Sequence, residues 1–169
     1  MDDWRAVFET NVFGLVEVTR RAVPELRRSG GGVVCNVTSS SLLVPVPFYA
    51  VYRASKAAVA AIGETLSAEL APFGIRVIEI LPGPIATDML AGSDRLPEAA
   101  RHGGYEEMAR SMHVARRSVQ DMVTAPRAAA EAIADAILEE GGGLRRACDP
   151  LGQGLIDAWS ADPRQFLPS

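Results

Sequence analysis

The sequence predicts an α/β protein with a doubly wound parallel sheet, and three observations support this prediction. Residues 33–38 (VVCNVT) and 75–81 (IRVIEIL) are short apolar runs, rich in β-branched residues, of the length expected for buried strands. Longer segments with helical spacing of apolar residues precede, separate and follow these runs. Glycine and proline clusters mark the boundaries. Such an alternation of helix and strand is typical of a parallel sheet with helices on both faces.

The first element is expected to be a helix over residues 3–28, with Asp3 as its N-cap. Apolar residues recur along this segment on one helical face: Trp4, Val7, Phe8, Val12, Leu15 and Leu26. The glycine triplet 30–32 ends the helix. The first strand, 33–38, follows, and Asn36 is the one strongly polar residue inside it. A strand that is apolar on both faces fits a sheet covered on both sides.

The second helix is expected over residues 48–70, after a loop broken by prolines, and the sequence Pro72-Phe73-Gly74 stops it. Strand 75–81 follows and closes at the PGP sequence of residues 82–84. Parallel sheets of this type bind ligands at the carboxyl ends of their strands. We therefore expect a functional site in the residues that follow positions 38 and 81.

The remainder is expected to begin with a loose polar region over residues 87–123, with one or two short helices. A regular helix should then start at Thr124 as N-cap, carry Pro126 in its first turn and end at Gly141. Residues 144–148 predict a short third strand, followed by a tail with proline turns. The sequence has no internal repeats, so residues 1–169 are expected to form a single domain.

Composition excludes several classes of protein. The chain has 169 residues, 48% hydrophobic residues and a net charge of −4, as an ordinary globular domain does, and its arginines are scattered among acids. We therefore expect no nucleic-acid partner. The most apolar stretch, 42–52, is short and contains two prolines, and Met1 is followed by two aspartates, so we expect no membrane span, no targeting segment and a cytoplasmic location. Cys35 and Cys148 lack metal-binding spacing, and no metal is expected.

Lys56 is the only lysine in the sequence, and it stands four residues after Tyr52 in the expected second helix. Residues four apart share a helix face. A positive charge about 5 Å away, at an effective dielectric near 20, favours a phenolate by about 3 kcal/mol. That would lower the pKa of Tyr52 by roughly two units, towards a working pH. The alternative is that Tyr52 is a core aromatic residue and Lys56 a solvated surface charge.

Polar residues lie where the sheet geometry predicts a ligand. Ser39, Ser40 and Ser41 follow the first strand, although serines at such a position also serve simply to make turns. Asn11 falls on the apolar face of the first helix, where a buried amide needs a partner. Asn11 therefore has either a functional role or a role in holding its own helix.

The chain resembles the C-terminal part of a short-chain dehydrogenase/reductase, a family of NAD(P)-dependent oxidoreductases with a Rossmann fold. The segments that carry the resemblance are NVFG (residues 11–14), VVCNVTSS (33–40), YRASKAAVAAIGETLSAELAPFGIRV (52–77) and LPGPIATDM (81–89). They occur in the order and with the spacing of the family. The fold implied is a partial Rossmann-like sheet of three strands with flanking helices.

The resemblance implies four catalytic residues. Tyr52 would be the general acid/base for the substrate oxygen, and Lys56 would lower its pKa and hold the nicotinamide ribose. Ser39 would bind the substrate carbonyl, with Ser41 as the alternative, and Asn11 would anchor a water in the proton relay. The cofactor contacts implied are Tyr52, Lys56, Pro82, Gly83, the backbone of Ile85 and the hydroxyl of Thr87. The expected activity is hydride transfer between NAD or NADP and a secondary alcohol or ketone.

The family's Gly-rich turn, which cradles the pyrophosphate, has no counterpart in the sequence. The chain is therefore expected to be a truncated product, a fragment or the result of a misassigned start, with cofactor affinity weakened at least about a thousandfold. The strand 33–38 should also have only one neighbour, which leaves an exposed edge. The choice between NAD and NADP and the identity of the substrate are left open.

Three further expectations follow from the resemblance. Residues 88–123 should form the substrate lid, in which His102 and His113 are expected to be solvent-exposed. The helices at 3–28 and 48–70 should pair with their copies in a homo-oligomer. The alternative to an active oxidoreductase is a catalytically inactive remnant that acts at most as a dimerisation or interaction module.

Overall fold

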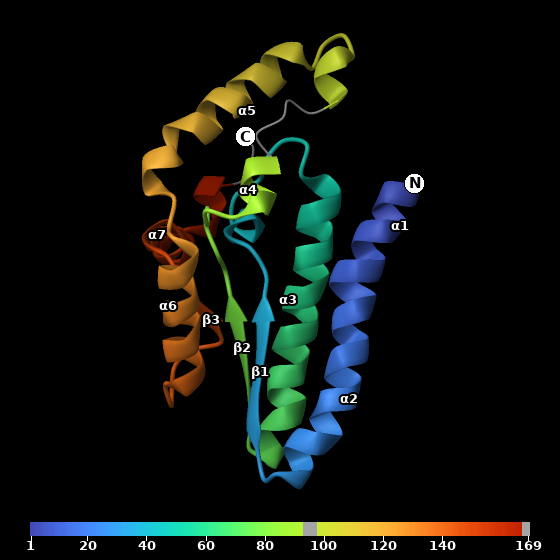
Figure 1. Cartoon of the computed structure of the whole chain (residues 1–169), viewed down its shortest axis with the longest axis vertical. Helices are drawn as coiled ribbons and strands as arrows, with labels where there is room; N and C mark the ends of the chain where they lie inside the picture. The colour runs from blue at the N-terminus through green and yellow to red at the C-terminus, as the bar shows by residue number, and fades with distance from the viewer. Residues whose placement is uncertain (93–97, 167–169) are drawn as a thin grey trace.

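The computed structural model describes residues 1–92 and 98–166, and its centre is a three-stranded parallel sheet (Figure 1). The strand order is β1-β2-β3, with β1 at Gly32–Val37, β2 at Ile75–Ile80 and β3 at Arg145–Arg146. The register of the first pair runs from Gly32 opposite Ile75 to Val37 opposite Ile80. The prediction of a doubly wound α/β sheet with three strands is therefore confirmed.

The N-terminal helix is one continuous run with a π-helical insertion. It consists of α1 (Asp2–Phe8), a π-helical segment (Glu9–Phe13) and α2 (Gly14–Arg28). The bounds agree with the expected 3–28, but the proposed cap is wrong. Met1 occupies the N-cap position and Asp3 lies inside the first turn, where its charge complements the helix dipole without a side-chain cap hydrogen bond.

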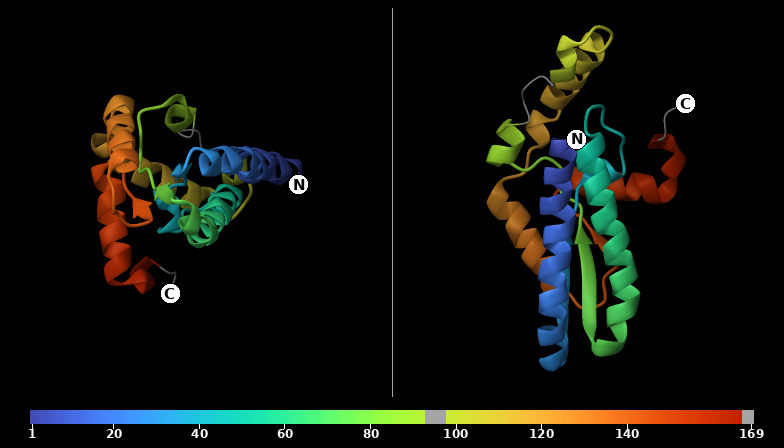
Figure 2. Two further views of the ribbon diagram at one scale, coloured as in Figure 1. Left: turned by 90° about the horizontal axis from the view of Figure 1, so that it is seen from below. Right: turned by 90° about the vertical axis from the view of Figure 1, so that its right-hand side faces the viewer.

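Helix α3 (Ala50–Leu70) makes the crossover between β1 and β2 and packs along the sheet (Figure 2). It begins two residues after the expected position and ends in a short 3-10 turn, Ala71–Phe73, followed by Gly74 in the left-handed region at φ +67°. Only glycine adopts this conformation without strain, so the PFG sequence acts as the predicted stop. Even α3, with 21 residues, is not apolar enough to cross a bilayer, and no other helix in the described ranges is.

The sheet has a hydrophobic core on each face because side chains alternate along β2. Ile75 and Val77 pack with Leu70 and residues of α2 and α3 on one side. Ile78 and Ile80 pack against the helix α6 (Pro126–Leu138) on the other side. Figure 2 shows this arrangement, with the sheet between the N-terminal and C-terminal helices. Both faces are covered, which explains why most residues of β1 and β2 are apolar.

The region after β2 is more helical than expected. It contains α4 (Asp88–Gly92), a 3-10 turn (Glu98–Arg101), the 13-residue helix α5 (Glu106–Ser118) and a second 3-10 turn (Gln120–Met122). Helix α6 follows with Ala125, and not Thr124, at its N-cap. The backbone of Thr124 instead forms a parallel bridge with Ile85.

The C-terminal helix α7 (Pro150–Ala161) corrects the prediction of an irregular tail, and a 3-10 turn (Pro163–Phe166) follows it. Asp149 caps α7 through a hydrogen bond from the Gly152 N–H, and Pro150 occupies the first helical turn. An aspartate followed by proline is a helix-start signal that was present in the sequence.

β1 forms one edge of the sheet. Within the described ranges it pairs only with β2, as expected, and the Val37 side chain on it is 45% exposed. The second interface that a buried parallel strand normally has is therefore open on β1.

Candidate active site

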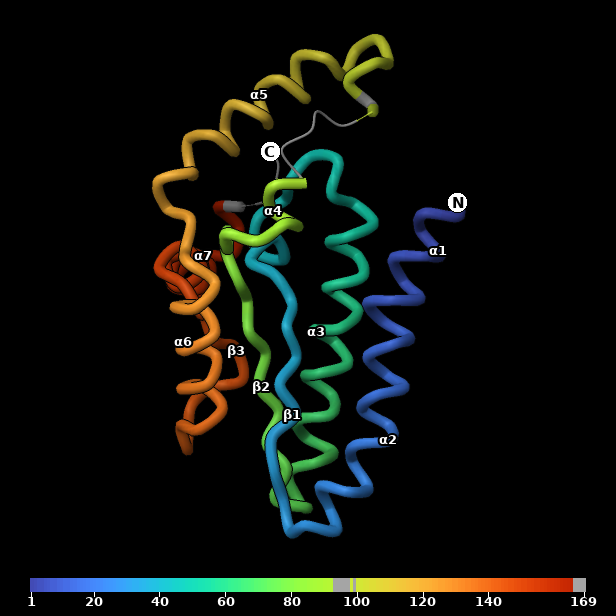
Figure 3. The backbone as a smooth tube through the Cα atoms, viewed as in Figure 1, coloured from blue at the N-terminus to red at the C-terminus, as the bar shows by residue number. Residues whose placement is uncertain are grey.

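The loops that follow β1 and β2 are held together at the carboxyl end of the sheet. The Thr38 N–H donates to the Ile80 carbonyl at 2.8 Å, and the Ser40 N–H donates to the Pro82 carbonyl at 2.9 Å. Figure 3 shows both loops leaving the sheet at the same end, where α3 begins. Residues 39–41, 82–87 and the first turns of α3 therefore converge, as the strand order predicts.

Ser39 and Tyr52 meet at this end of the sheet. Ser39 caps the 3-10 turn Ser40–Leu42, and its Oγ accepts hydrogen bonds from the backbone N–H of Ser41, at 3.2 Å, and from the Ser41 hydroxyl, at 2.9 Å. Hydrogen bonding with Ser39 lowers the pKa of Tyr52, which places the two side chains near each other. Ser41 thus contacts Ser39 directly through both its backbone N–H and its hydroxyl.

Lys56 lies one helical turn after Tyr52, on the same side of α3. Its Nζ is 5.8 Å from the centroid of the Tyr52 ring and donates to the Val37 carbonyl at 2.9 Å. The ammonium group is thus anchored at the last residue of β1, beside the phenol. Burial lowers the pKa of Lys56 because it disfavours the charged form.

The expected effect of Lys56 on Tyr52 is not what the structure shows. Burial raises the pKa of Tyr52 above its ordinary value, since a phenolate loses solvation there. The hydrogen bond with Ser39 lowers this pKa, and the neighbouring Tyr49 raises it further. The Lys56 ammonium donates its hydrogen bond to the Val37 carbonyl.

Asn11 connects the N-terminal helix to α3. It lies in the π-helical segment, and its Nδ2 donates to the Ser55 hydroxyl at 3.0 Å. Ser55 in turn donates to the Tyr52 carbonyl at 2.7 Å, within its own helix. Insertions of this kind in helices are frequent at functional sites. Asn11 thus reaches the helix that carries Tyr52 and Lys56, and it does not simply hold its own backbone.

The loop 82–87 is fixed at several points. The Pro84 carbonyl accepts from Thr124 N–H at 2.9 Å, and Ala86 N–H donates to the Thr124 carbonyl at 3.0 Å. The exposed Thr87 donates its N–H to the Ile85 carbonyl at 2.7 Å, and its hydroxyl lies 3.3 Å from the same oxygen. Among the described residues, no group accepts a hydrogen bond from the Ile85 N–H. Gly83 differs, because its N–H is already bonded to Asp149 at 2.7 Å.

Aromatic contacts join the expected lid, residues 88–123, to the start of α3. The Tyr105 ring stands edge-on to Phe48 with 6.2 Å between ring centroids, and the Arg116 guanidinium lies 5.9 Å from the Tyr49 ring centroid. His102 is exposed, whereas His113 is half-buried on α5. Residues 93–97 of this segment lie outside the described residues.

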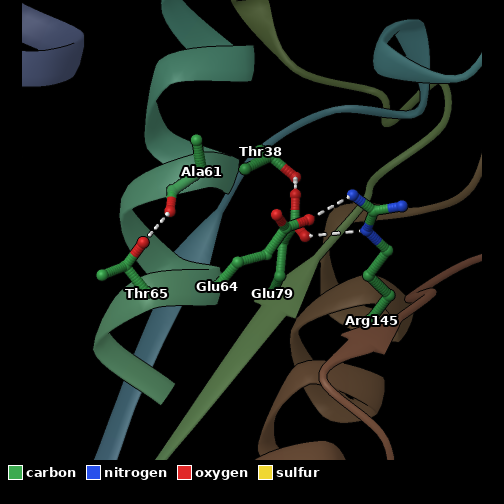
Figure 4. A network of polar contacts seen from close by, with 6 residues as sticks. All are labelled: Thr38, Ala61, Glu64, Thr65, Glu79 and Arg145. Carbon is green, nitrogen blue, oxygen red and sulfur yellow. Dashed lines mark hydrogen bonds and ion pairs between the residues drawn. The ribbon is translucent and has the colours of Figure 1, made fainter. Parts of the chain in front are cut away.

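Sequence reasoning missed a polar network beside the site (Figure 4). The buried Glu79 carboxylate accepts from the Thr38 hydroxyl at 2.8 Å and from the Arg145 guanidinium at 3.1 Å. Arg145 also reaches Glu64 on α3 at 2.8 Å and lies 5.2 Å from the ring centroid of Trp159 on α7. The signal in the sequence was a glutamate at an inner position of a mostly apolar strand, which requires a buried partner.

Two hollows of the surface, of about 440 and 300 Å³, lie at the amino ends of the strands and away from the site. Pro24 and Phe73 line the first, and Gly74 and Gly142 line the second, so neither includes a site residue. Within residues 1–92 and 98–166, no group of three or more His, Cys, Asp or Glu side chains could hold a metal ion.

Comparison with known sequences gives matches over the N-terminal part of the chain. A profile of the family described as short chain dehydrogenase matches residues 1–96. The oxidoreductase YusZ of Bacillus subtilis is 41% identical over 93 residues, which are 55% of this chain and 33% of that protein. Cyclopentanol dehydrogenase of a Comamonas species is 38% identical over 100 residues, 59% of this chain and 40% of that protein.

Comparison with solved structures extends the likeness to nearly the whole chain. A short chain dehydrogenase from Burkholderia cenocepacia, crystallised in complex with NADP, superposes with a TM-score of 0.71 at 30% identity. The superposition covers 98% of this chain and 61% of that protein. The matched regions therefore span less than two thirds of the length of these relatives.

Proposed function

Because this chain belongs to the short-chain dehydrogenase family, we propose that it carries the proton-transfer residues of an NAD- or NADP-dependent oxidoreductase that acts on a secondary alcohol or ketone. The observation that carries the proposal is the meeting of Ser39 and Tyr52 at the carboxyl end of the sheet, with Lys56 one turn away. During hydride transfer, negative charge develops on or leaves the substrate oxygen. An acid/base group can exchange a proton with that oxygen, and a neighbouring hydroxyl can stabilise its charge by a hydrogen bond.

Tyr52 is the proposed general acid/base. In reduction its phenol gives a proton to the carbonyl oxygen, and in oxidation its phenolate takes the proton of the alcohol. The nicotinamide ring, when bound, supplies or accepts the hydride. Ser39 would donate a hydrogen bond to the same substrate oxygen, while Ser41 holds the Ser39 hydroxyl in place. Asn11 acts through Ser55 on the helix that carries Tyr52.

The residues present fit the nicotinamide end of such a cofactor. Ile85 has a backbone N–H without an acceptor among the described residues, and this N–H could donate to a carboxamide oxygen. Thr87 has an exposed hydroxyl in the same loop. The Lys56 ammonium has further donors beyond the one that Val37 accepts, and these could bind ribose hydroxyls. Crystallisation of a 30% identical relative with NADP supports the proposal.

Replacing single tyrosines tests the assignment. The 169-residue polypeptide would be assayed with NAD and NADP against a panel of secondary alcohols and ketones, as wild type, Tyr52→Phe and Tyr49→Phe. Tyr49 is the matched control because its ring stands edge-on to the Tyr52 ring, with 6.0 Å between the ring centroids. The Tyr49→Phe change removes only a hydroxyl and keeps this ring. We expect Tyr52→Phe to reduce kcat by at least about 100-fold and Tyr49→Phe to leave it within a few-fold.

Two outcomes would contradict the proposal. Equal activities of the two variants would remove Tyr52 from the chemistry. A folded wild-type polypeptide without turnover, even at nucleotide concentrations that compensate for the expected loss of affinity of about a thousandfold, would favour the alternative, an inactive member of the family that serves in association. The apolar residues exposed on the N-terminal helix, among them Phe13 at 57% and Val18 at 68%, are the observation behind that alternative.

A further inference from the structure

Asp149 joins two segments that are far apart in the sequence. It lies three residues after the end of β3, and it is almost fully buried, with the residue 8% exposed. Oδ2 accepts from the Gly83 N–H at 2.7 Å, and Oδ1 accepts from the Gly152 N–H at 2.8 Å. One carboxylate therefore connects the loop after β2 with the first turn of α7.

The local chemistry explains why a carboxylate is tolerated at this depth. Hydrogen bonds from N–H groups to an ionised acceptor are about twice as strong as neutral ones, and the start of α7 adds a favourable dipole. The Sγ of Cys148 lies 3.8 Å from Oδ2, and no ion pair to Asp149 is present among the described residues. The backbone amides of Gly83 and Gly152 therefore provide the main compensation for burial.

Both glycines are required by this contact. A Cβ on Gly83 would lie 2.5 Å from Asp149 Oδ1 and 3.2 Å from the side chain of Leu151. A Cβ on Gly152 would lie 2.8 Å from the Leu81 carbonyl and 3.0 Å from Asp149 Oδ2. Neither glycine has a φ in the left-handed region, so the reason is close approach and not backbone conformation.

We propose that Asp149 is a positioning residue that fixes the loop 82–87, and that Gly83 serves this contact instead of contacting a cofactor. The other bonds that hold the loop, to Ser40 and Thr124, are backbone bonds. In the described part of the chain, Asp149 provides the one side-chain hydrogen bond to residues 82–84. Its effect on cofactor binding rests on the proposed function, because it acts through the Ile85 N–H two residues further on.

The first test is a double-mutant cycle on unfolding free energy with Gly83→Ala and Asp149→Ala. As a single substitution, Gly83→Ala should be strongly destabilising, because the new Cβ would clash with the Asp149 carboxylate. In the Asp149→Ala background the clashing oxygen is absent, so the same change should have a much smaller effect. Additive effects of the two substitutions would show that Gly83 is glycine for another reason, and they would overturn the proposed contact.

The second test separates the loop from the helix cap. Asp149→Ser keeps a good N-cap for α7, but its hydroxyl is too short to bond Gly83 and Gly152 together. Amide hydrogen exchange should then become at least tenfold faster at Gly83, whereas the amides in the body of α7 keep their protection. Unchanged exchange at Gly83 would refute the positioning role. This measurement needs no cofactor and no activity.

The third test concerns the consequence for binding. Asp149→Ser should weaken the affinity for NAD or NADP by about tenfold, while the pH dependence set by Tyr52 stays the same. If the exchange and cycle results are as expected but the wild type binds neither nucleotide, the proposed function fails and the positioning role stands. If the wild type binds and Asp149→Ser binds equally well, the link from Asp149 to the cofactor loop is wrong.

Discussion

Arg145 donates a hydrogen bond to Glu79 across 3.1 Å, from Nε to Oε2, although the Glu79 side chain is only 2% exposed. The pair lies beside the candidate site because the other Glu79 oxygen holds the hydroxyl of Thr38, the residue before Ser39 (Figure 4). A buried carboxylate with a single cationic partner depends strongly on that partner. Glu79 on β2 is thus hydrogen-bonded both to Thr38, the residue after β1, and to Arg145 on β3.

Arg145→Met should therefore destabilise the protein by about 3–5 kcal/mol, since it leaves an uncompensated buried charge. The free energy of unfolding in urea measures this. Glu64→Gln is the matched control, because Glu64 binds the same guanidinium but is 51% exposed, and we expect it to cost less than about 1 kcal/mol. The double variant Arg145→Met/Glu79→Gln should recover part of the loss. Equal effects of Arg145→Met and Glu64→Gln would show that the buried pair is unimportant.

The pKa of Tyr52 should be visible in a spectroscopic titration. Burial raises it, so the difference in phenolate absorbance between wild type and Tyr52→Phe should titrate above the ordinary tyrosine range. Ser39→Ala should move this pKa further upward, because it removes the hydrogen bond that lowers it. Ser41→Ala should have a smaller effect. A midpoint below that of an ordinary tyrosine would contradict the structure.

The same shift makes stability depend on pH at the alkaline end. The folded protein keeps the Tyr52 proton to a higher pH than the unfolded chain does, since its folded pKa is raised. The stabilisation is fully present below the unfolded pKa of about 10 and is lost as the pH rises through the folded value. Unfolding midpoints measured through this range should fall less steeply in Tyr52→Phe than in the wild type.

Phe48 adopts a φ of +67°, in the left-handed region that is unfavourable for residues with a Cβ. Phe48→Ala and Phe48→Gly both lose the contact with Tyr105, but only glycine relieves the strain. We expect the glycine variant to be more stable than the alanine variant by about 0.5–1 kcal/mol. At Val46, where φ is not positive, the order should reverse. Thermal unfolding of the four variants decides this.

Cys148 should be a poor nucleophile. Burial, the negative charge of Asp149 and their hydrogen bond raise the pKa of its thiol to about 11. At pH 8 the native protein should therefore react slowly with a thiol reagent at this position. Asp149→Asn should lower the pKa and speed the reaction, measured in a Cys35→Ser background. A rate that does not change would mean that the Asp149 charge does not act on the thiol.

The apolar residues exposed on the N-terminal helix should mediate self-association. Phe13 and Val18 are 57% and 68% exposed, and the N-terminal helix packs beside α3, as the expected homo-oligomer requires. Light scattering should detect dimers or larger species, and Phe13→Asp/Val18→Asp should shift the population to monomers. Arg20→Asp, an exposed charge change on the same helix, is the control. A monomeric wild type at all concentrations would refute the interface.

The sequence by itself determined the architecture of this protein. Apolar runs of strand length, helical spacing and glycine stops led to the two long strands, the long helices and the shared carboxyl end, because these features depend on local chain preferences. The Tyr52 and Lys56 spacing likewise predicted that both side chains lie on one face of α3. The helix α7 was missed although Asp149 and Pro150 marked its start, so that error lay in the interpretation and not in the chain.

The tertiary structure alone decided which partner each polar group has. Asp149 lies 66 residues from Gly83, and Arg145 lies 66 residues from Glu79, so no local pattern connects them. It also decided the direction of the Tyr52 pKa, because desolvation depends on everything packed around the ring. The spacing of Tyr52 and Lys56 along the helix indicates that the two side chains are near each other. Burial and hydrogen bonds formed across the fold decide the pKa of Tyr52.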